Sequence, residues 1–264
     1  MRLHCPRISH QTLRPWVLAS LSLIIQARAQ FYQPIVIDAS LLKFFGENTA
    51  FAAKAEFITQ TDGKPDVMPV KIAILGNMAR VEMDITQRKG GRASDDVMAG
   101  YYEDLKTAGS AEAVSIFNPS KKSTYIILPR LKAYLQTPIP DKELEQLKKR
   151  PKSETTELGK DKIGSRDCTK YKIAFSPERS MDAWRTWETP AATVWTTQGP
   201  PASPLRLDVF GSDGRTNCVL AIGDVQPGKV DTTLFEPPRG FKKCGTPDAL
   251  MQVIMEHWPK EKNQ

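Results

Sequence analysis

The stretch VKIAILGNMARVEMD, residues 70–84, decides the fold class. Its apolar residues alternate with other residues on both sides of Gly76-Asn77, a pattern typical of strands with one buried face. A Gly-Asn pair between two such runs indicates a two-residue turn, because its first position needs a positive φ. The stretch therefore predicts a β-hairpin.

The same alternation recurs along most of the chain. It covers residues 51–57, 113–117, 124–128, 169–175, 192–196, 205–209 and 218–222. Apolar residues at helical spacing predict three or four helices, among them helices over residues 94–109, 141–149 and 247–258. The last has Thr246 as its cap and Pro247 at its first position. Strands in hairpin order with few helices predict an α+β domain around one large antiparallel sheet.

The first 29 residues have the layout of a secretory signal peptide. Arginines precede an apolar stretch at residues 16–25, which is too short to cross a bilayer as a stable helix. Small residues at Ala27 and Ala29 predict cleavage between Ala29 and Gln30. An uncleaved anchor or a fortuitous apolar N-terminus is the alternative. We therefore expect a signal peptide over residues 1–29 and an exported single domain over residues 30–264, periplasmic or secreted, with no transmembrane segment.

Removing residues 1–29 changes both the charge and the cysteine count. The whole chain has 37 basic and 30 acidic residues, and the signal holds four arginines and no acidic residue, so 33 basic residues remain and the net charge falls to +3. This charge is too weak to indicate nucleic acid. Cys168, Cys218 and Cys244 remain, which permits one disulfide and one free thiol, or three free thiols.

Few residues could support catalysis. After cleavage His257 is the single histidine, so a Ser-His-Asp site could form only there, and a solvated helix end is the alternative. Zinc sites need clustered Cys and His, which the sequence lacks. Residues 223–229 match GxxxxGK, but Val230 stands where a phosphate-binding loop needs Ser or Thr. We predict no enzyme activity, no cofactor and no metal.

Several stretches resemble an uncharacterised (DUF-type) family of exported bacterial proteins. They are FAAKAEFITQTDGKPDVMPVKIAILGNMARVEMD at 51–84, AVSIFNPSKKSTYIILPRLKAYLQTPIP at 113–140, ETTELGKDKIGSRDCTKYKI at 154–173 and FEPPRGF at 235–241. The layout of that family is similar to the LolA/LolB lipoprotein-carrier superfamily. The resemblance implies a curved, open half-barrel with helices packed against its concave face, and a hollow that holds acyl chains. The chain departs from the family at residues 177–190, which look like an enlarged loop.

Two sets of residues are candidate binding sites. The first is apolar and is expected on the concave side of the sheet: Phe51, Phe57, Ile72, Ile74, Val81, Met83, Tyr125, Ile127, Tyr171, Ile173, Leu207 and Val209. It would line a pocket for a lipid, an acyl chain or another hydrophobic ligand, and an ordinary packed core is the alternative.

The second set is the tryptophans Trp184, Trp187 and Trp195, which could meet an envelope protein or cover the end of the sheet. The sequence thus predicts a non-enzymatic envelope binding protein. The alternative is a structural or sensor interaction domain with a filled core, and a hydrolase has the least support.

Overall fold

A computed structural model gives the arrangement of the chain. It describes residues 35–42, 44–45, 49–61, 63–91, 96–148, 153–175, 191–198, 203–211, 214–228 and 230–259. Residues Ile35–Gln264 form one compact unit, and the predicted signal peptide with its cleavage site lies outside the described residues. No helix of the described part is long and apolar enough to cross a membrane.

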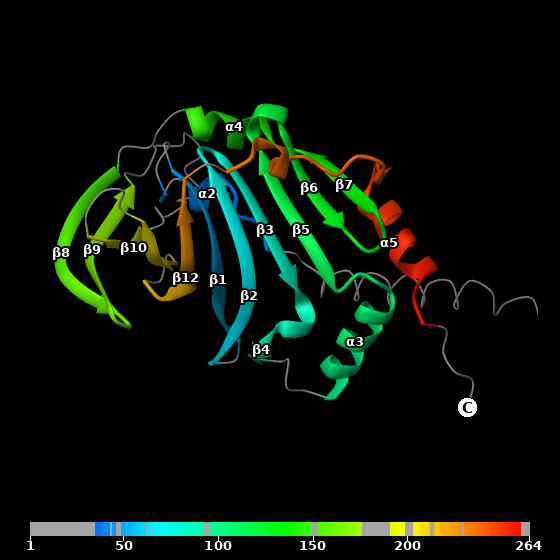
Figure 1. Cartoon of the computed structure of the whole chain (residues 1–264), viewed down its shortest axis with the longest axis horizontal. Helices are drawn as coiled ribbons and strands as arrows, with labels where there is room; N and C mark the ends of the chain where they lie inside the picture. The colour runs from blue at the N-terminus through cyan, green and yellow to red at the C-terminus, as the bar shows by residue number, and fades with distance from the viewer. Residues whose placement is uncertain are drawn as a thin grey trace, which may run out of the picture. The chain divides into compact units, whose positions relative to one another are not determined.

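The described part of the unit is built around one 13-stranded sheet (Figure 1). The strand order is β13-β7-β6-β5-β3-β2-β1-β12-β11-β10-β9-β8, and β4 pairs with β2. The strands are β1 (Ala50–Thr61), β2 (Lys64–Leu75), β3 (Met78–Asp84), β4 (Lys89–Gly90), β5 (Glu112–Asn118), β6 (Ser123–Leu128), β7 (Ala133–Pro138), β8 (Ser153–Ile163), β9 (Arg166–Phe175), β10 (Ala191–Thr197), β11 (Pro204–Phe210), β12 (Thr216–Pro227) and β13 (Lys242–Cys244).

All pairings are antiparallel except that of β13 with β7. The two ends of the strand order, β13 and β8, do not pair with each other, so the sheet is open. This confirms the predicted fold class, and the open antiparallel sheet is the layout that the resemblance to the LolA/LolB carriers implies.

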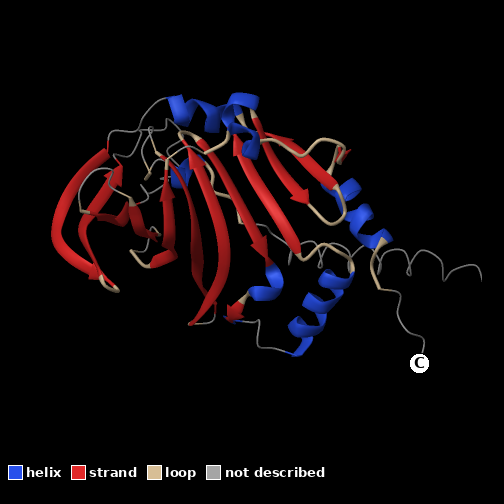
Figure 2. Ribbon diagram, in the orientation of Figure 1, coloured by secondary structure: helices blue, strands red, loops and turns tan. Residues whose placement is uncertain are grey.

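Within the described residues the helices are short and few, as Figure 2 shows against the strands. They are α2 (Ala39–Leu42), α3 (Asp96–Thr107), α4 (Asp141–Lys148) and α5 (Pro247–Glu256), with 3₁₀ turns η1 (Ile85–Gln87), η3 (Pro119–Lys121) and η4 (Thr232–Phe235). Helix α5 packs against β7 and β13, α3 against η1, and α2 against α4. Thr246 caps α5 by accepting a hydrogen bond from the Ala249 amide at 3.2 Å, as predicted.

The register divides the side chains of the sheet between two faces, because directly opposed residues of a pair point to the same side. We call inner the face that carries Phe51, opposite Ile74, and Val81, opposite Ser115. Residues 35–42 and 44–45 cover it: the Ser115 hydroxyl donates to the Ile35 carbonyl, and the rings of Phe45 and Phe51 lie 5.9 Å apart.

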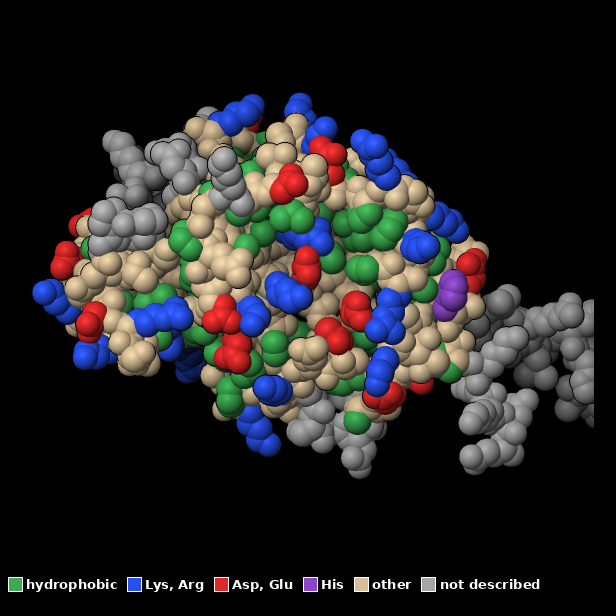
Figure 3. All heavy atoms as spheres, in the orientation of Figure 1, with side chains coloured by type: hydrophobic (Ala, Val, Ile, Leu, Met, Phe, Trp, Pro, Cys, Tyr) green, Lys and Arg blue, Asp and Glu red, His purple; other side chains and the backbone are tan. Residues whose placement is uncertain are grey.

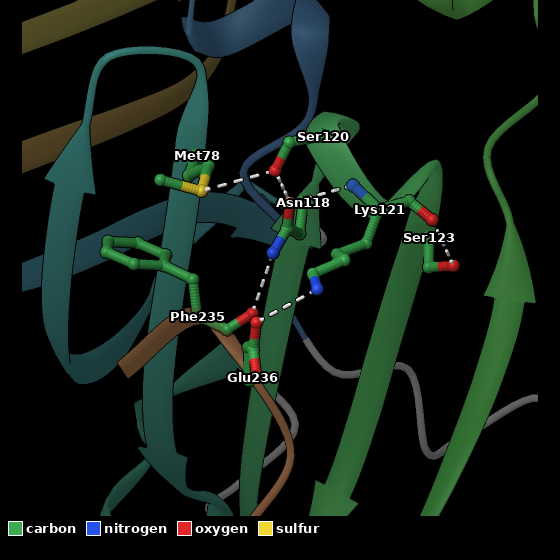
Figure 4. Close-up of polar contacts among 7 residues, drawn as sticks. All are labelled: Met78, Asn118, Ser120, Lys121, Ser123, Phe235 and Glu236. Atoms are coloured by element: carbon green, nitrogen blue, oxygen red, sulfur yellow. Dashed lines mark hydrogen bonds and ion pairs between the residues drawn. The ribbon is translucent and has the colours of Figure 1, made fainter. Parts of the chain in front are cut away.

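The outer face is covered at one end by residues 230–241, which we call the C-terminal strap. Phe235 of the strap is fully buried against the β2, β5 and β6 residues Ala73, Val114, Ile116, Tyr125 and Ile127. The Asn118 side-chain amide donates to the Phe235 carbonyl at 3.0 Å, and Lys121 pairs with Glu236 at 3.4 Å (Figure 4). The strap therefore closes an apolar cluster that the strands alone would expose.

The predicted hairpins and helices are confirmed. Strands β2 and β3 are joined at Gly76-Asn77 with Gly76 at φ 57°, and β5 and β6 are joined through Asn118-Pro119-Ser120. Helices α3, α4 and α5 fall within the three predicted ranges, and Gly109, just beyond α3, has φ 72°. A positive φ after a helix favours glycine, which is why the sequence indicates that end.

Candidate functional site

An open trough of about 870 Å³ lies across the outer face. Strands β1, β2, β3, β5, β11 and β12 contribute to it, together with Ile163 at the end of β8. Its apolar lining residues include Pro69, Val114, Pro129, Ile163, Leu205 and Ala221. This volume is in the range of small-molecule sites, so the trough is the candidate binding site.

Charged side chains of both signs line the trough: Lys54, Glu56, Lys71, Glu82, Asp84, Glu112 and Asp224. In Figure 3, basic and acidic side chains gather side by side over the middle of this face. The strand register places Lys71 directly between Lys54 and Glu82. A Lys–Lys pair directly opposed across two strands is unfavourable unless an anionic group compensates it.

Some of these charges already have partners. Lys54 Nζ lies 3.0 Å from Asp224 Oδ2, and this hydrogen bond lowers the pKa of the Asp224 carboxyl. Glu82 pairs with Arg80 at 2.9 Å. Among the described residues, neither Lys71 nor Glu56 forms an ion pair. The Lys71 ammonium and the Glu56 carboxylate are thus available to pair with a ligand.

Trp195 anchors the β8–β11 end of the trough. It is 7% exposed and packs with Cys168, Leu205 and Ile163, of which the last two line the trough. Its indole N–H donates to Asp161 Oδ2 at 2.9 Å, which lowers the pKa of that carboxyl. Lys170 and Arg206, the cross-strand neighbours of Trp195, lie 4.9 and 5.2 Å from its ring centroid. These contacts hold the wall of the trough in place.

Ten of the twelve apolar residues in the predicted ligand set share the inner face. Five of them, Phe51, Ile72, Ile74, Val81 and Leu207, are at most 3% exposed, and Met83 is also buried. The other four, Phe57, Tyr171, Ile173 and Val209, are half-buried. The buried members lie in the packed core, whereas the half-buried members extend from β1 to β9 on the same face.

Tyr125 and Ile127 do not lie with that set. Ile116 is opposite Tyr125 and Val114 is opposite Ile127, so both point to the outer face and pack under Phe235. We predicted that both residues lie on the face that carries Ile72, and this prediction is wrong. The β5–β6 turn sets the pairing that places them on the outer face. Alternation within a strand shows which residues share a face, but the turn decides which face the next strand presents.

Of the three tryptophans of the predicted partner loop, the structure describes only Trp195. Trp195 lies in strand β10 and is buried rather than presented on a loop. Trp184 and Trp187 lie outside the described residues. His257 is at the C-terminal end of α5, where a ring nitrogen lies 2.9 Å from the Val253 carbonyl oxygen.

Sequence reasoning missed the trough, although its signal is present. Lys54, Glu56 and Glu82 form the polar side of alternating strands, a side that the sequence alone indicates as solvated. What the sequence does not give is the order of strands that brings them together, since β1 pairs with both β2 and β12. In the described residues, no group of three or more His, Cys, Asp or Glu is arranged to hold a metal ion.

The three cysteines Cys168, Cys218 and Cys244 are free thiols. Cys218 lies on the inner face opposite Val209 and Thr59. Burial, with a smaller effect of the Asp208 carboxylate, raises the pKa of the Cys218 thiol from 9.0 to about 11.

At pH 8 we therefore expect Cys218 to react with iodoacetamide about a hundredfold more slowly than an ordinary thiol, because the thiolate is the reactive form. Peptide mapping by mass spectrometry after timed alkylation gives the rate for this residue. The rate should rise up to about pH 11 in the folded chain and level off near pH 9 in denaturant. The same pH profile in both states would contradict the assignment.

No protein-family model matches the chain, and no curated protein sequence matches it. Among solved structures, the chain is similar to an uncharacterized conserved protein from Thermus thermophilus, with 10% identity, a TM-score of 0.42 and coverage of 86% of this chain and 99% of the other. It is also similar to the lipoprotein LppX of Mycobacterium tuberculosis, with 13% identity, a TM-score of 0.37 and coverage of 83% and 100%.

A third similar structure is a putative outer membrane lipoprotein-sorting protein domain from Vibrio parahaemolyticus, with 13% identity, a TM-score of 0.28 and coverage of 74% of this chain and 94% of the other. These identities and TM-scores are low, so the likenesses assign no ligand, partner or site residue to this chain.

Proposed function

We propose that this chain is an exported, non-enzymatic binding protein of the bacterial cell envelope, and that it binds a polypeptide segment in the trough of its outer face. The observation that supports this most is the charge arrangement of the trough. Lys71 and Glu56 form no ion pair with any described residue. The apolar residues Pro69 and Val114 line the same trough. Export rests on the predicted signal peptide.

The chemistry of the trough fits a polypeptide better than an acyl chain. An acyl chain laid across it would remove water from Lys71, Glu56 and their charged neighbours without replacing those hydrogen bonds, which is costly. A polypeptide supplies backbone donors and acceptors, and charged side chains of either sign, while its apolar side chains meet Pro69 and Val114.

Site-specific photo-crosslinking tests this proposal. A benzophenone amino acid replaces Gln87, an exposed and uncharged residue that lines the trough. The full chain is expressed with its own N-terminal segment in a bacterium and irradiated in the cell. We expect a discrete protein adduct from this position, and none from the exposed Lys142 on α4, which is the matched control. Adding Glu56→Lys should reduce the adduct about tenfold, because it reverses a charge inside the trough.

Two results would reject a polypeptide ligand in the trough. One is the same set of adducts from positions 87 and 142. The other is an adduct from position 87 whose yield is unchanged by Glu56→Lys while the variant keeps the wild-type unfolding midpoint.

A hydrophobic ligand on the inner face is the second candidate function. The half-buried side chains Phe57, Tyr171, Ile173 and Val209 favour it, because they leave apolar surface on one face of the sheet. Native mass spectrometry of the chain purified from a bacterial envelope, followed by organic extraction, tests for a bound lipid or fatty acid. A bound lipid that is lost in Ile173→Asp would support a carrier; a bare polypeptide mass would favour the trough alone.

A further inference from the structure

The two edges of the sheet are built differently. Strand β13 has three residues, runs parallel to β7 and is packed by helix α5. Strand β8 at the other edge has eleven residues and pairs with β9 on one side only. Within the described part of the chain, no other strand pairs with β8, and most of its residues are exposed. A long exposed edge strand is a template for another chain.

A β-bulge in this edge puts two opposite charges on the same face. Glu157 lies opposite Tyr171 and Lys160 lies opposite Thr169, and these two β9 residues are two positions apart. The extra residue of the bulge is Leu158, and the backbone of Gly159 has φ 117°. Without the bulge, residues 157 and 160 would point to opposite faces. Glu157 and Lys160 therefore both point to the inner face.

We infer that a second copy of this chain adds to β8, edge to edge and antiparallel, to form a two-fold symmetric dimer. In this dimer the two-fold axis passes through Gly159, which lies opposite Gly159 of the other copy. Leu158 is the extra residue of the bulge and takes no part in the pairing. Glu157 of each copy then lies opposite Lys160 of the other. The edge then carries two matched cross-strand ion pairs, one on each side of the axis. The same register pairs Thr155 with Lys162.

Two of the other charges of β8, those of Asp161 and Lys162, are already used within one copy. Asp161 accepts from the Trp195 indole, and Lys162 lies 3.5 Å from Asp167. Glu157 and Lys160 form no ion pair with any other described residue. A parallel arrangement of two copies would oppose Glu157 to Glu157, so the charge order selects the antiparallel one.

An exposed apolar side chain next to the axis adds to the match. Leu158 is 51% exposed, the largest exposed fraction among the large apolar residues of the described chain. The antiparallel register brings the two Leu158 residues to adjacent positions beside the axis. Burying them between the copies would remove apolar surface from water at the centre of the contact.

Charge reversal with mixing tests this dimer. Sedimentation equilibrium of the full chain should show a concentration-dependent dimer. Glu157→Lys and Lys160→Glu should each weaken self-association about tenfold or more, because each variant turns both ion pairs into like-charge pairs. An equimolar mixture of the two variants should dimerise again, since each copy then meets its complement, and the double variant Glu157→Lys/Lys160→Glu should also dimerise.

Misfolded variants would not dimerise again when they are mixed, so recovery in the mixture excludes misfolding as the cause of the loss. Met255→Asp is the control for Leu158→Asp, because Met255 is also an exposed apolar residue, 40% exposed on α5. That variant should dimerise like the wild type, whereas Leu158→Asp should not. A chain that stays monomeric at every soluble concentration, or single variants that associate as strongly as the wild type, would overturn the inference. Neither Glu157 nor Lys160 lines the trough, so the result is independent of any ligand there.

Discussion

Phe235→Ala is expected to lower the free energy of unfolding by about 3–5 kcal/mol, the usual loss for removing a fully buried phenylalanine. The side chain is 0% exposed and fills the outer-face cluster under the C-terminal strap. The strap backbone is fixed by Asn118, which donates to the Phe235 carbonyl, and by Arg80, which donates to the Leu234 carbonyl at 3.0 Å. Because these bonds hold the strap, the space left by the ring cannot close easily.

Chemical denaturation of the wild type and the variant, followed by circular dichroism, measures this loss. The neighbouring residue gives the matched control: Leu234 is on the same turn of η4 and is 39% exposed, so Leu234→Ala should change stability by only about 0.5 kcal/mol. Equal effects of the two substitutions would show that the strap does not close the core. Val114 lies both under Phe235 and in the trough, so Phe235→Ala should also loosen that end of the candidate site.

Local structure could be predicted from the sequence where a single short-range signal decides it. Gly76-Asn77 sets the β2–β3 turn because only a small set of residues tolerates a positive φ at its first position. Thr246 and Pro247 set the start of α5 because cap and first-turn chemistry are local. The alternation in strands such as β1 and β3 indicates which residues share a face within each strand.

The candidate site could not be predicted because it depends on pairings far apart in the sequence. Lys54 meets Asp224 only because β1 pairs with β12. The expected side of the sheet is wrong for Tyr125 because strand alternation does not specify which face a following strand presents. The bulge at Leu158 places Glu157 and Lys160 on the same face. It could not be predicted from the sequence either, because an extra residue interrupts the two-residue alternation that marks a strand.

Arg88→Met is expected to cost about 3–5 kcal/mol, because it leaves a buried carboxylate without its guanidinium. Asp66 of β2 is 3% exposed, and Arg88 donates to it through both Nε, at 2.7 Å from Oδ1, and a terminal nitrogen. The hydrogen bond with Asp66 raises the pKa of the Arg88 guanidinium, so this group stays charged at any ordinary pH. The pair joins β2 to the segment that follows η1.

Removing both charges should cost less than removing one. In Asp66→Leu/Arg88→Met the carboxylate is gone and its desolvation cost with it, so we expect this double variant to recover at least half of the loss of Arg88→Met. Arg130→Met is the matched control, since both partners of the Arg130–Glu112 pair are exposed, and it should cost about 1 kcal/mol or less. Urea unfolding of the wild type and these three variants measures the losses. A double variant less stable than Arg88→Met would mean that the ion pair stabilises the β2–β4 region beyond satisfying its own buried charge.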